Sequence, residues 1–273
     1  MRAGKVARMT MTILLVLGVA YLGVIALAWF GQGRMIYPVP NPSDAIPSGY
    51  DRIEHATPDG LTLFAGYRPA SQGMPTLLFF HGNGSSWQST AMVTETLAAQ
   101  GYGVMASEYR GYGGNPGTPS EQGLYDDARG AWQWLLEQGV EPGDIALVGN
   151  SIGAGVATHL ASEVEARALI LVSPFDSLHE TASRQMRWLP VRMLLRDRYD
   201  NAAKLPRIAE PVLILHGEAD TVIAVEQARA LAASRKDTVI ETFPDWGHDL
   251  VDNPAVQDRI ALFVGSYGTD QRR

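Results

Sequence analysis

The sequence predicts an α/β protein in which a mostly parallel sheet of eight strands is flanked by helices and preceded by one transmembrane helix. Three observations carry this prediction. Short apolar runs alternate with longer stretches of helical character after residue 50. The later runs lack alternating polar residues, as is typical of strands buried on both faces of a parallel sheet. An uninterrupted apolar run of 20 residues precedes all of them.

This first element, residues 11–30, contains no charged residue. As a helix it would extend about 30 Å, the thickness of one hydrocarbon core. The run has no polar face, which disfavours a buried helix of a soluble domain. Residues 1–10 carry Arg2, Lys5 and Arg8 without any acid, so the positive-inside rule predicts a cytoplasmic N-terminus. The rest of a single-pass protein then lies on the extracytoplasmic side, which is the periplasm in a bacterium.

A cleaved signal peptide is the alternative to an uncleaved signal anchor. The sequence ALA at 26–28 offers a cleavage site of the A-x-A type. The apolar run is long for a signal peptide, and Trp29 and Phe30 suit a membrane interface, so we favour the anchor. Residues 31–50, rich in Pro, Gly and Ser, then form a connector on the domain surface.

A hairpin opens the second domain, residues 51–267. Two predicted strands, 51–57 and 61–67, flank the turn sequence PDG at 58–60. Strands and helices alternate beyond it, and Ser120 is placed to cap one of the helices. The further strands are 76–80, 103–107, 145–149, 168–173, 212–216 and 238–243, and the helices are 87–100, 120–138, 154–163, 224–234 and 253–266. Residues 268–273 form a tail.

Residues 174–211 interrupt this alternation, because 38 residues separate two strands. A simple crossover needs fewer, so the segment is a candidate lid. Between residues 184 and 207 it holds seven Arg or Lys and two Asp, in a chain whose net charge is −7. This basic segment is either a solvated helix face or a surface that meets anionic head groups or an acidic substrate.

The composition excludes several classes of function. The chain has no cysteine, which rules out disulfides, thiolate metal sites and a cysteine nucleophile. Its acidic balance provides no basic face for nucleic acid, and it contains no RNA-binding signature and no internal repeat. Its 273 residues, 46% of them hydrophobic, are enough to bury one sizeable core.

The sequence GNSIG at 149–153 is the first candidate for chemistry. The motif alone is weak in a chain this rich in glycine. Here, however, it lies between a predicted buried strand and a helix rich in alanine, which is the context of a nucleophile elbow. The glycines let the backbone turn sharply, so that the Ser151 hydroxyl stands at the carboxyl edge of the sheet, where ligands of such sheets bind.

A serine hydroxyl becomes a nucleophile when an adjacent base takes its proton, and histidine suits this role near neutral pH. In this type of sheet the chain order is serine, acid, histidine. His248 follows the last predicted strand and fits that order. Of the other five histidines, His55 and His81 precede the serine, and His159 lies in the helix after it. His179 lies in the lid, and His216 ends a strand.

The acid must orient the imidazole and stabilise its protonated form. Asp220, which follows the strand 212–216 by a short loop, is the predicted acid. Asp176 after the preceding strand is the alternative, and Glu218 is a weaker third choice. Asp249 neighbours the histidine in sequence, but adjacent side chains rarely have the required geometry.

An oxyanion hole needs two hydrogen-bond donors near the nucleophile. One predicted donor is the backbone N–H of Ile152, directly after the serine. The other comes from the loop after an early strand, in the sequence LLFFHGNGSS at 77–86. We choose the backbone N–H of Asn83, because the glycines on both sides keep it accessible.

In combination these stretches resemble the α/β-hydrolases. The sequence is most similar to the membrane-anchored group of Bem46-like and ABHD12/13/17-type serine hydrolases, which overlaps the S33-type serine aminopeptidase signature. An anchor followed by the sequence MIYP at 35–38 also fits this group. Asn150 before the nucleophile and Asn115 in place of a frequent serine depart from common patterns and leave every catalytic position filled. The matching stretches are FFHGNG (79–84), EYRGYGGNPGTPSEQGLYDDA (108–128), GNSIGAG (149–155), SPFDSL (173–178), HGEADTVI (216–223) and GH (247–248).

The resemblance implies an enzyme with Ser151 as nucleophile, Asp220 as acid and His248 as base, and with no metal and no organic cofactor. It implies hydrolysis of an ester, thioester or amide through an acyl-enzyme. The leading expectation is an ester or thioester of a small lipid-like or acyl substrate. A peptidase of the S33 type is the alternative, although an aminopeptidase needs a negative site for the substrate amine. A non-catalytic binding protein on the same fold is the third, disfavoured possibility, because every catalytic position is filled. The sequence does not determine the substrate or the oligomeric state.

Overall fold

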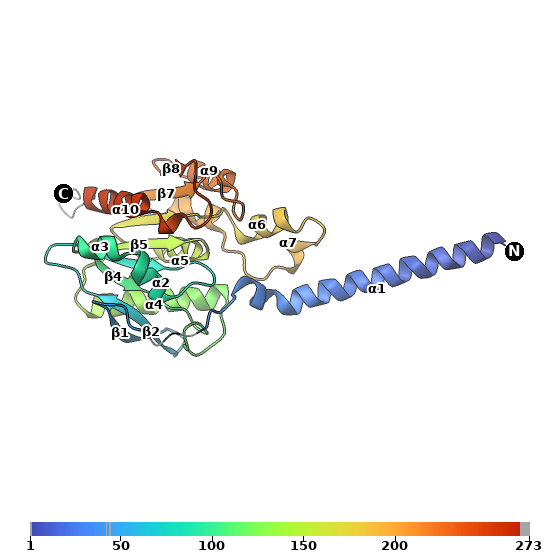
Figure 1. Cartoon of the computed structure of the whole chain (residues 1–273), viewed down its shortest axis with the longest axis horizontal. Coiled ribbons are helices and arrows are strands. Elements are labelled where there is room, and N and C mark those ends of the chain that lie inside the picture. Colours follow the sequence, from blue (N-terminus) through green and yellow to red (C-terminus); the bar gives the residue numbers. More distant parts are fainter. Residues whose placement is uncertain (1, 42, 44, 268–273) are drawn as a thin grey trace.

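A computed structural model describes residues 2–41, 43 and 45–267 (Figure 1). The predicted tail, 268–273, lies outside the described residues. A sheet with helices on both faces forms the body of the protein, and one long N-terminal helix projects from it (Figure 1).

The sheet has eight strands in the order β1-β2-β4-β3-β5-β6-β7-β8. Only β2 runs against its neighbours, and every other pairing is parallel. The predicted mostly parallel α/β fold is therefore confirmed, and the predicted strand ends agree with the structure to within one residue. The bounds are β1 (Asp51–Ala56), β2 (Thr62–Arg68), β3 (Thr76–Phe80), β4 (Gly103–Ala106), β5 (Ile145–Asn150), β6 (Ala168–Val172), β7 (Val212–Gly217) and β8 (Val239–Phe243).

Two apolar layers hold the helices to the sheet. On one face lie α4 (Glu121–Glu137), α5 (Ile152–Ala161) and α9 (Val225–Ala233). On the other lie α2 (Trp87–Val93), α3 (Glu95–Ala99) and α10 (Pro254–Ser266). The central strands β3 and β5 to β7 are buried on both faces, which is why their sequences are continuous apolar runs.

The predicted single helix 87–100 is wrong, because it is interrupted at Thr94. The hydroxyl of Thr94 donates a hydrogen bond to the Thr90 carbonyl at 2.7 Å and lies 3.1 Å from the Tyr50 hydroxyl. Such bonds from a threonine to the preceding turn bend helices. By contrast, the predicted cap is confirmed, since the Ser120 side chain accepts a hydrogen bond from the Gly123 N–H at 3.1 Å.

The strand order sets the place of the site. From β3 the chain passes to β4 on one side and then to β5 on the other. The loops that leave β3 and β5 therefore diverge, and their separation opens a crevice at the carboxyl edge of the sheet. This crevice lies where the sequence predicts the nucleophile and the oxyanion loop.

The N-terminal helix α1 (Arg2–Ile36) is longer than the predicted span of 11–30. Its length and composition would allow residues 4–36 to cross a membrane. Residues 31–36, expected in the connector, are helical. The helix ends two residues before Pro38, where the chain cannot continue as a helix without strain.

The lid segment contains α6 (Leu178–Gln185), α7 (Val191–Leu194) and α8 (Asn201–Lys204). Short 3₁₀ turns occupy Pro142–Asp144, Leu205–Arg207 and Leu250–Asp252. Figure 1 shows α6 and α7 beside the end of α1 that joins the domain. The Tyr37 hydroxyl fastens this junction by donating to Asp197 Oδ2 at 2.7 Å.

Candidate active site

Ser151 stands at a strained turn between β5 and α5. Its φ of 53° and ψ of −117° lie outside the favoured regions for a side chain with a Cβ, at a cost of about 1–3 kcal/mol. A Cβ on Gly149 would lie 2.3 Å from the Gly153 carbonyl oxygen, and one on Gly153 would lie 2.1 Å from that of Phe80. The two glycines therefore allow the close approach of α5 to the sheet, while the serine itself takes the strained conformation.

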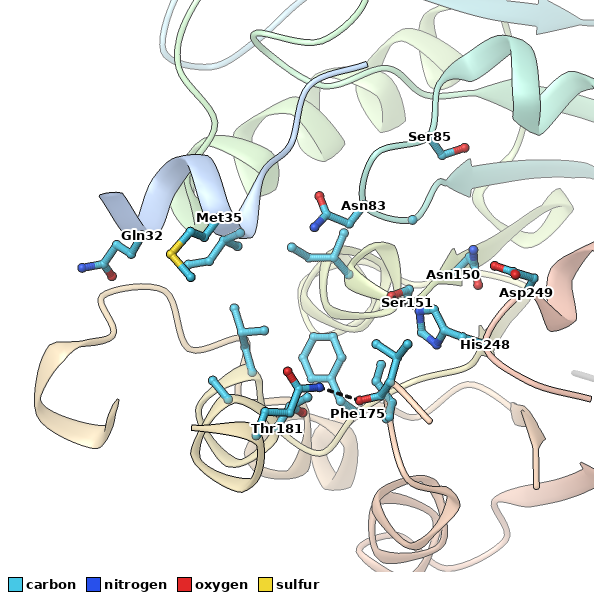
Figure 2. Close-up of a pocket in the computed structure, with 18 of the residues that line it drawn as sticks. Gln32, Met35, Asn83, Ser85, Asn150, Ser151, Phe175, Thr181, His248 and Asp249 are labelled. Carbon is cyan, nitrogen blue, oxygen red and sulfur yellow. Dashed lines mark hydrogen bonds between the residues drawn. The ribbon is translucent and has the colours of Figure 1, made fainter. Parts of the chain in front are cut away.

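The three residues predicted to react lie in one hydrogen-bonded chain. Ser151 Oγ is 3.0 Å from His248 Nε2, and Figure 2 shows the two side chains next to each other. His248 Nδ1 is 2.8 Å from Asp220 Oδ2. An ionised carboxylate only accepts, so Nδ1 carries a proton and Nε2 is free to accept from the serine hydroxyl. Asp220 comes from the loop after β7 and His248 from the loop after β8.

Asp220 is held as an ionised acceptor. Its side chain is fully buried, and Oδ1 accepts the backbone N–H groups of Val222 and Ile223, both at 2.8 Å. Burial raises the pKa of Asp220, but the hydrogen bonds from His248 and from the two N–H groups outweigh it. The net pKa lies below its ordinary value, so the carboxylate carries its charge at neutral pH.

A second histidine lies behind the acid. His216 Nε2 donates to the Ile223 carbonyl at 2.9 Å and lies 3.4 Å from Asp220 Oδ2. Burial lowers the pKa of His216 below its ordinary value, so this ring is neutral near pH 7. In the sequence, His216 is distinguished only as the end of a predicted strand. Its spacing of four residues from Asp220 was the available indication of their contact.

The alternative acids lie elsewhere. Asp176 accepts the Ser177 N–H at 2.6 Å, and its backbone carbonyl accepts the N–H of Asn201. Glu218 pairs with Arg229 at 2.9 Å. Of the three candidate carboxylates, the structure brings Asp220 to His248.

The two predicted oxyanion donors belong to segments that adjoin the serine. Ile152 is the first residue of α5, so its N–H has no acceptor within that helix. Asn83 and Gly82 follow β3, and a Cβ on Gly82 would lie only 3.5 Å from that of Ser151. The Tyr112 hydroxyl donates to Asn83 Oδ1 at 3.1 Å and braces this loop.

A buried pair that was not predicted from the sequence supports the oxyanion loop. His81 Nδ1 donates to the Gly82 carbonyl at 2.8 Å, and His81 Nε2 is 2.8 Å from Glu108 Oε1. Chain order excluded His81 as the base and left it without a role. The joint presence of HGNG and EYRG in the sequence was the only indication of this pair.

These groups open into a cavity of about 800 Å³. Ser151 and His248 lie on its inner wall (Figure 2). Most of its other wall residues are apolar, and the lid and α1 provide more than half of these apolar residues. Figure 2 shows Gln32 and Met35 of α1 on the side of the cavity away from the serine. Within the described part of the chain, no group of three or more His, Asp or Glu side chains could hold a metal ion.

Comparison with known proteins places the chain in a family. The family model described as "Serine aminopeptidase, S33" matches residues 73–202. An uncharacterized protein of Mycobacterium tuberculosis (strain ATCC 25618 / H37Rv) is 39% identical over 254 residues, which cover 89% of this chain and 90% of that protein. Lysophosphatidylserine lipase ABHD12 of Danio rerio is 34% identical over 177 residues. That match covers 58% of this chain and 46%, about half, of the lipase.

A solved structure agrees in fold. The Pyrococcus furiosus esterase Pf2001 superposes with a TM-score of 0.67 at 23% identity, covering 85% of this chain and 99% of the esterase. The strand order, the turn at Ser151 and the sequence relatives all indicate the same family. The chain therefore belongs to the serine hydrolases of the α/β-hydrolase superfamily, with distant similarity to the ABHD12 and ABHD17 hydrolases.

Proposed function

We propose that this protein is a membrane-anchored enzyme that cleaves an ester or thioester of a lipid-like or acyl substrate. The observation that supports the proposal most is the pair of hydrogen bonds that links Ser151 to His248 and His248 to Asp220. They lie at the inner wall of a large, mostly apolar cavity. The family membership supports hydrolysis, and the names of the lipase and esterase relatives favour an oxygen or sulfur ester over an amide.

The geometry supports an acyl-enzyme mechanism. Ser151 Oγ attacks the carbonyl carbon while His248 Nε2 takes the hydroxyl proton, and Asp220 stabilises the imidazolium that forms. The N–H groups of Asn83 and Ile152 stabilise the negative oxygen of the tetrahedral intermediate. His248 then gives its proton to the leaving group. In the second half a water molecule loses a proton to His248 and attacks the acyl-enzyme. His248 then returns this proton to Ser151 Oγ as the acid is released.

The cavity favours an acyl chain as the bound part of the substrate. A volume of about 800 Å³ suits a ligand of lipid or drug size, and apolar walls stabilise methylene groups removed from water. We propose that α1 is an uncleaved anchor with Lys5 and Arg8 on the cytoplasmic side. The catalytic domain then lies on the extracytoplasmic side.

A peptidase is the second candidate, and one observation favours it besides the description of the family model. Asp249 and Asp252 lie on the cavity wall, where a carboxylate would meet the amine of a peptide substrate. Burial and the neighbouring charge of Asp249 raise the pKa of Asp252 above its ordinary value. The lid beside them is basic, so we place this function second.

The first test is reaction of the purified, detergent-solubilised protein with a fluorophosphonate probe. We expect the wild type to be labelled and the Ser151→Ala variant to be unlabelled. Nitrophenyl esters of increasing chain length and aminoacyl nitroanilides then separate the two candidates. Faster cleavage of nitroanilides than of esters would favour the peptidase. Absence of labelling in a folded wild type would support a non-catalytic binding protein.

A further inference from the structure

One face of the anchor helix is packed against the lid. Within residues 21–36 of α1, the side chains toward the lid recur every three or four positions, as one face of a helix requires. Apart from Tyr21, which is exposed, these side chains are half-buried, whereas most of their neighbours on α1 are exposed. The residues of this face are Tyr21, Ile25, Ala28, Gln32 and Ile36.

Polar contacts fix the position of the lid along this face. The Tyr21 hydroxyl donates to the Trp188 carbonyl at 2.8 Å. Gln32 Nε2 donates to the Leu194 carbonyl at 3.1 Å, and Gln32 Oε1 accepts the Arg196 N–H at 2.9 Å. The lid is thus joined to α1 at two points that lie three turns of helix apart.

The first of these contacts lies within the apolar run. Tyr21 precedes Phe30 by nine residues, which is about 14 Å along a helix. If residues 11–30 cross the hydrocarbon layer, residues 186–193, here called the lid tip, cannot stand in water above the membrane. The bond to Tyr21 holds them at the level of the lipid, at or below the boundary between head groups and acyl chains.

The composition of the lid suits that depth. Trp188 is 59% exposed and Met193 82% exposed, both at the lid tip. Arginines surround them, and all are exposed: Arg184, Arg187, Arg192, Arg196 and Arg198. Between residues 178 and 198 the sequence has two acids, Glu180 and Asp197. Glu180 pairs with Arg192, and Asp197 accepts a hydrogen bond from Tyr37. Arginine stems lie along acyl chains while their guanidinium groups reach lipid phosphates, and tryptophan favours the same boundary.

The lid tip also forms the outer wall of the cavity. Met186 and Leu189 of the tip line it, and so do Ala28 and Met35 of α1. The cavity is therefore closed on this side by the same two elements that would meet the lipid. A substrate that leaves the bilayer between them enters the cavity without passing through water.

We propose that the lid tip is embedded in the extracytoplasmic leaflet around α1, among anionic lipids, and that the acyl substrate enters the cavity laterally between α1 and the lid tip. This inference rests on the proposed anchor and hydrolase function and adds the route of the substrate. The absence of cysteine from the chain makes the test direct, because a single introduced cysteine carries the only label.

The depth experiment uses Met193→Cys with Leu262→Cys as its control, each carrying a nitroxide in proteoliposomes that contain phosphatidylglycerol. Leu262 is 62% exposed on α10, on the body of the protein. We expect the label at 193 to be several-fold more protected from a water-soluble nickel chelate than the label at 262, and more accessible to oxygen. Equal access of the chelate to both labels would overturn the proposal. So would protection at 193 that vanishes on dilution in lipid, since a second copy of the chain would then cover the tip.

The route experiment uses Met193→Glu, which places a charge on the lid tip outside the cavity wall. We expect slower hydrolysis of a lipid ester in vesicles and unchanged hydrolysis of a short water-soluble ester. Equal loss on both substrates would indicate a structural defect and contradict the route. Fluorophosphonate labelling in the same vesicles reports the function separately. A labelled wild type with a water-exposed lid tip would reject this inference alone.

Discussion

His81 Nε2 lies 2.8 Å from Glu108 Oε1 in the interior of the protein, where both side chains are almost inaccessible to water. The other ring nitrogen of His81 donates to the Gly82 carbonyl, one residue before the proposed oxyanion donor Asn83. Glu108 also accepts the backbone N–H of Trp87 at 3.1 Å. The pair thus ties the beginning of the oxyanion loop to the segment that follows β4.

Loosening this pair should impair turnover more than binding. Glu108→Gln keeps the size of the side chain but has one acceptor oxygen, whereas the two oxygens of Glu108 accept the backbone N–H groups of Tyr109 and Trp87. We expect kcat for a soluble ester to fall by about 10- to 100-fold with little change in KM, because the oxyanion donor is displaced. Glu95→Gln, at an exposed pair with Arg68, should leave both parameters unchanged. A rise in KM alone would contradict a positioning role for Glu108.

The identity of the acid can be tested with a matched pair of variants. Asp220→Asn should lower kcat by about 10⁴-fold, because an amide can no longer orient and stabilise the imidazolium of His248. Asp176→Asn should leave kcat unchanged, since that carboxylate bonds to the Ser177 N–H instead. Steady-state kinetics of both variants shows which carboxylate acts as the catalytic acid. A large loss in Asp176→Asn alone would transfer the role to that residue.

His55 should make stability depend on pH. Burial in β1 lowers the pKa of His55 from 6.5 to about 4. Between these values the unfolded chain binds a proton that the folded chain does not, so stability falls as pH falls from 6.5 to about 4 and then levels off. The loss from this group is about 3 kcal/mol.

Denaturant unfolding of the solubilised protein across this pH range measures the loss, and His55→Leu is the comparison. The other titrating groups act in both proteins, so the variant should lose less stability than the wild type on acidification. Parallel pH profiles for the two proteins would show that His55 does not titrate differently on folding.

Two helical glycines should respond oppositely to alanine. In Gly153→Ala the new Cβ would collide with the Phe80 carbonyl oxygen, and we expect a loss of about 3 kcal/mol or more in unfolding free energy. In Gly265→Ala the nearest atom is the Tyr102 hydroxyl at 3.5 Å, an ordinary contact. That variant should gain about 0.5–1 kcal/mol from higher helix propensity. Thermal unfolding compares the two, and equal effects would argue against the close approach of α5 to the sheet.

Local sequence was sufficient for most of the fold. The central strands were predictable because each is an unbroken apolar run, and the first hairpin because residues 58–60 combine proline, aspartate and glycine. The break at Thr94 was missed because threonine also occurs within helices. Its hydroxyl donates to the Thr90 carbonyl one turn back and lies 3.1 Å from that of Tyr50, a residue distant in the sequence. The extension of α1 to Ile36 was missed because the glycines there suggested a connector, whereas packing on the lid stabilises the helix.

The sequence by itself determined the residue types of the site and the strand ends that carry them, since both follow from local patterns. The tertiary structure decided which of these residues meet. Asp176 and Asp220 follow adjacent strands, and only the paths of their loops bring Asp220 to His248. The contact between Tyr21 and Trp188, 167 residues apart, is likewise set by how the lid packs on α1. Propensity and periodicity act over a few residues, whereas contacts between distant residues depend on the packing of the whole chain.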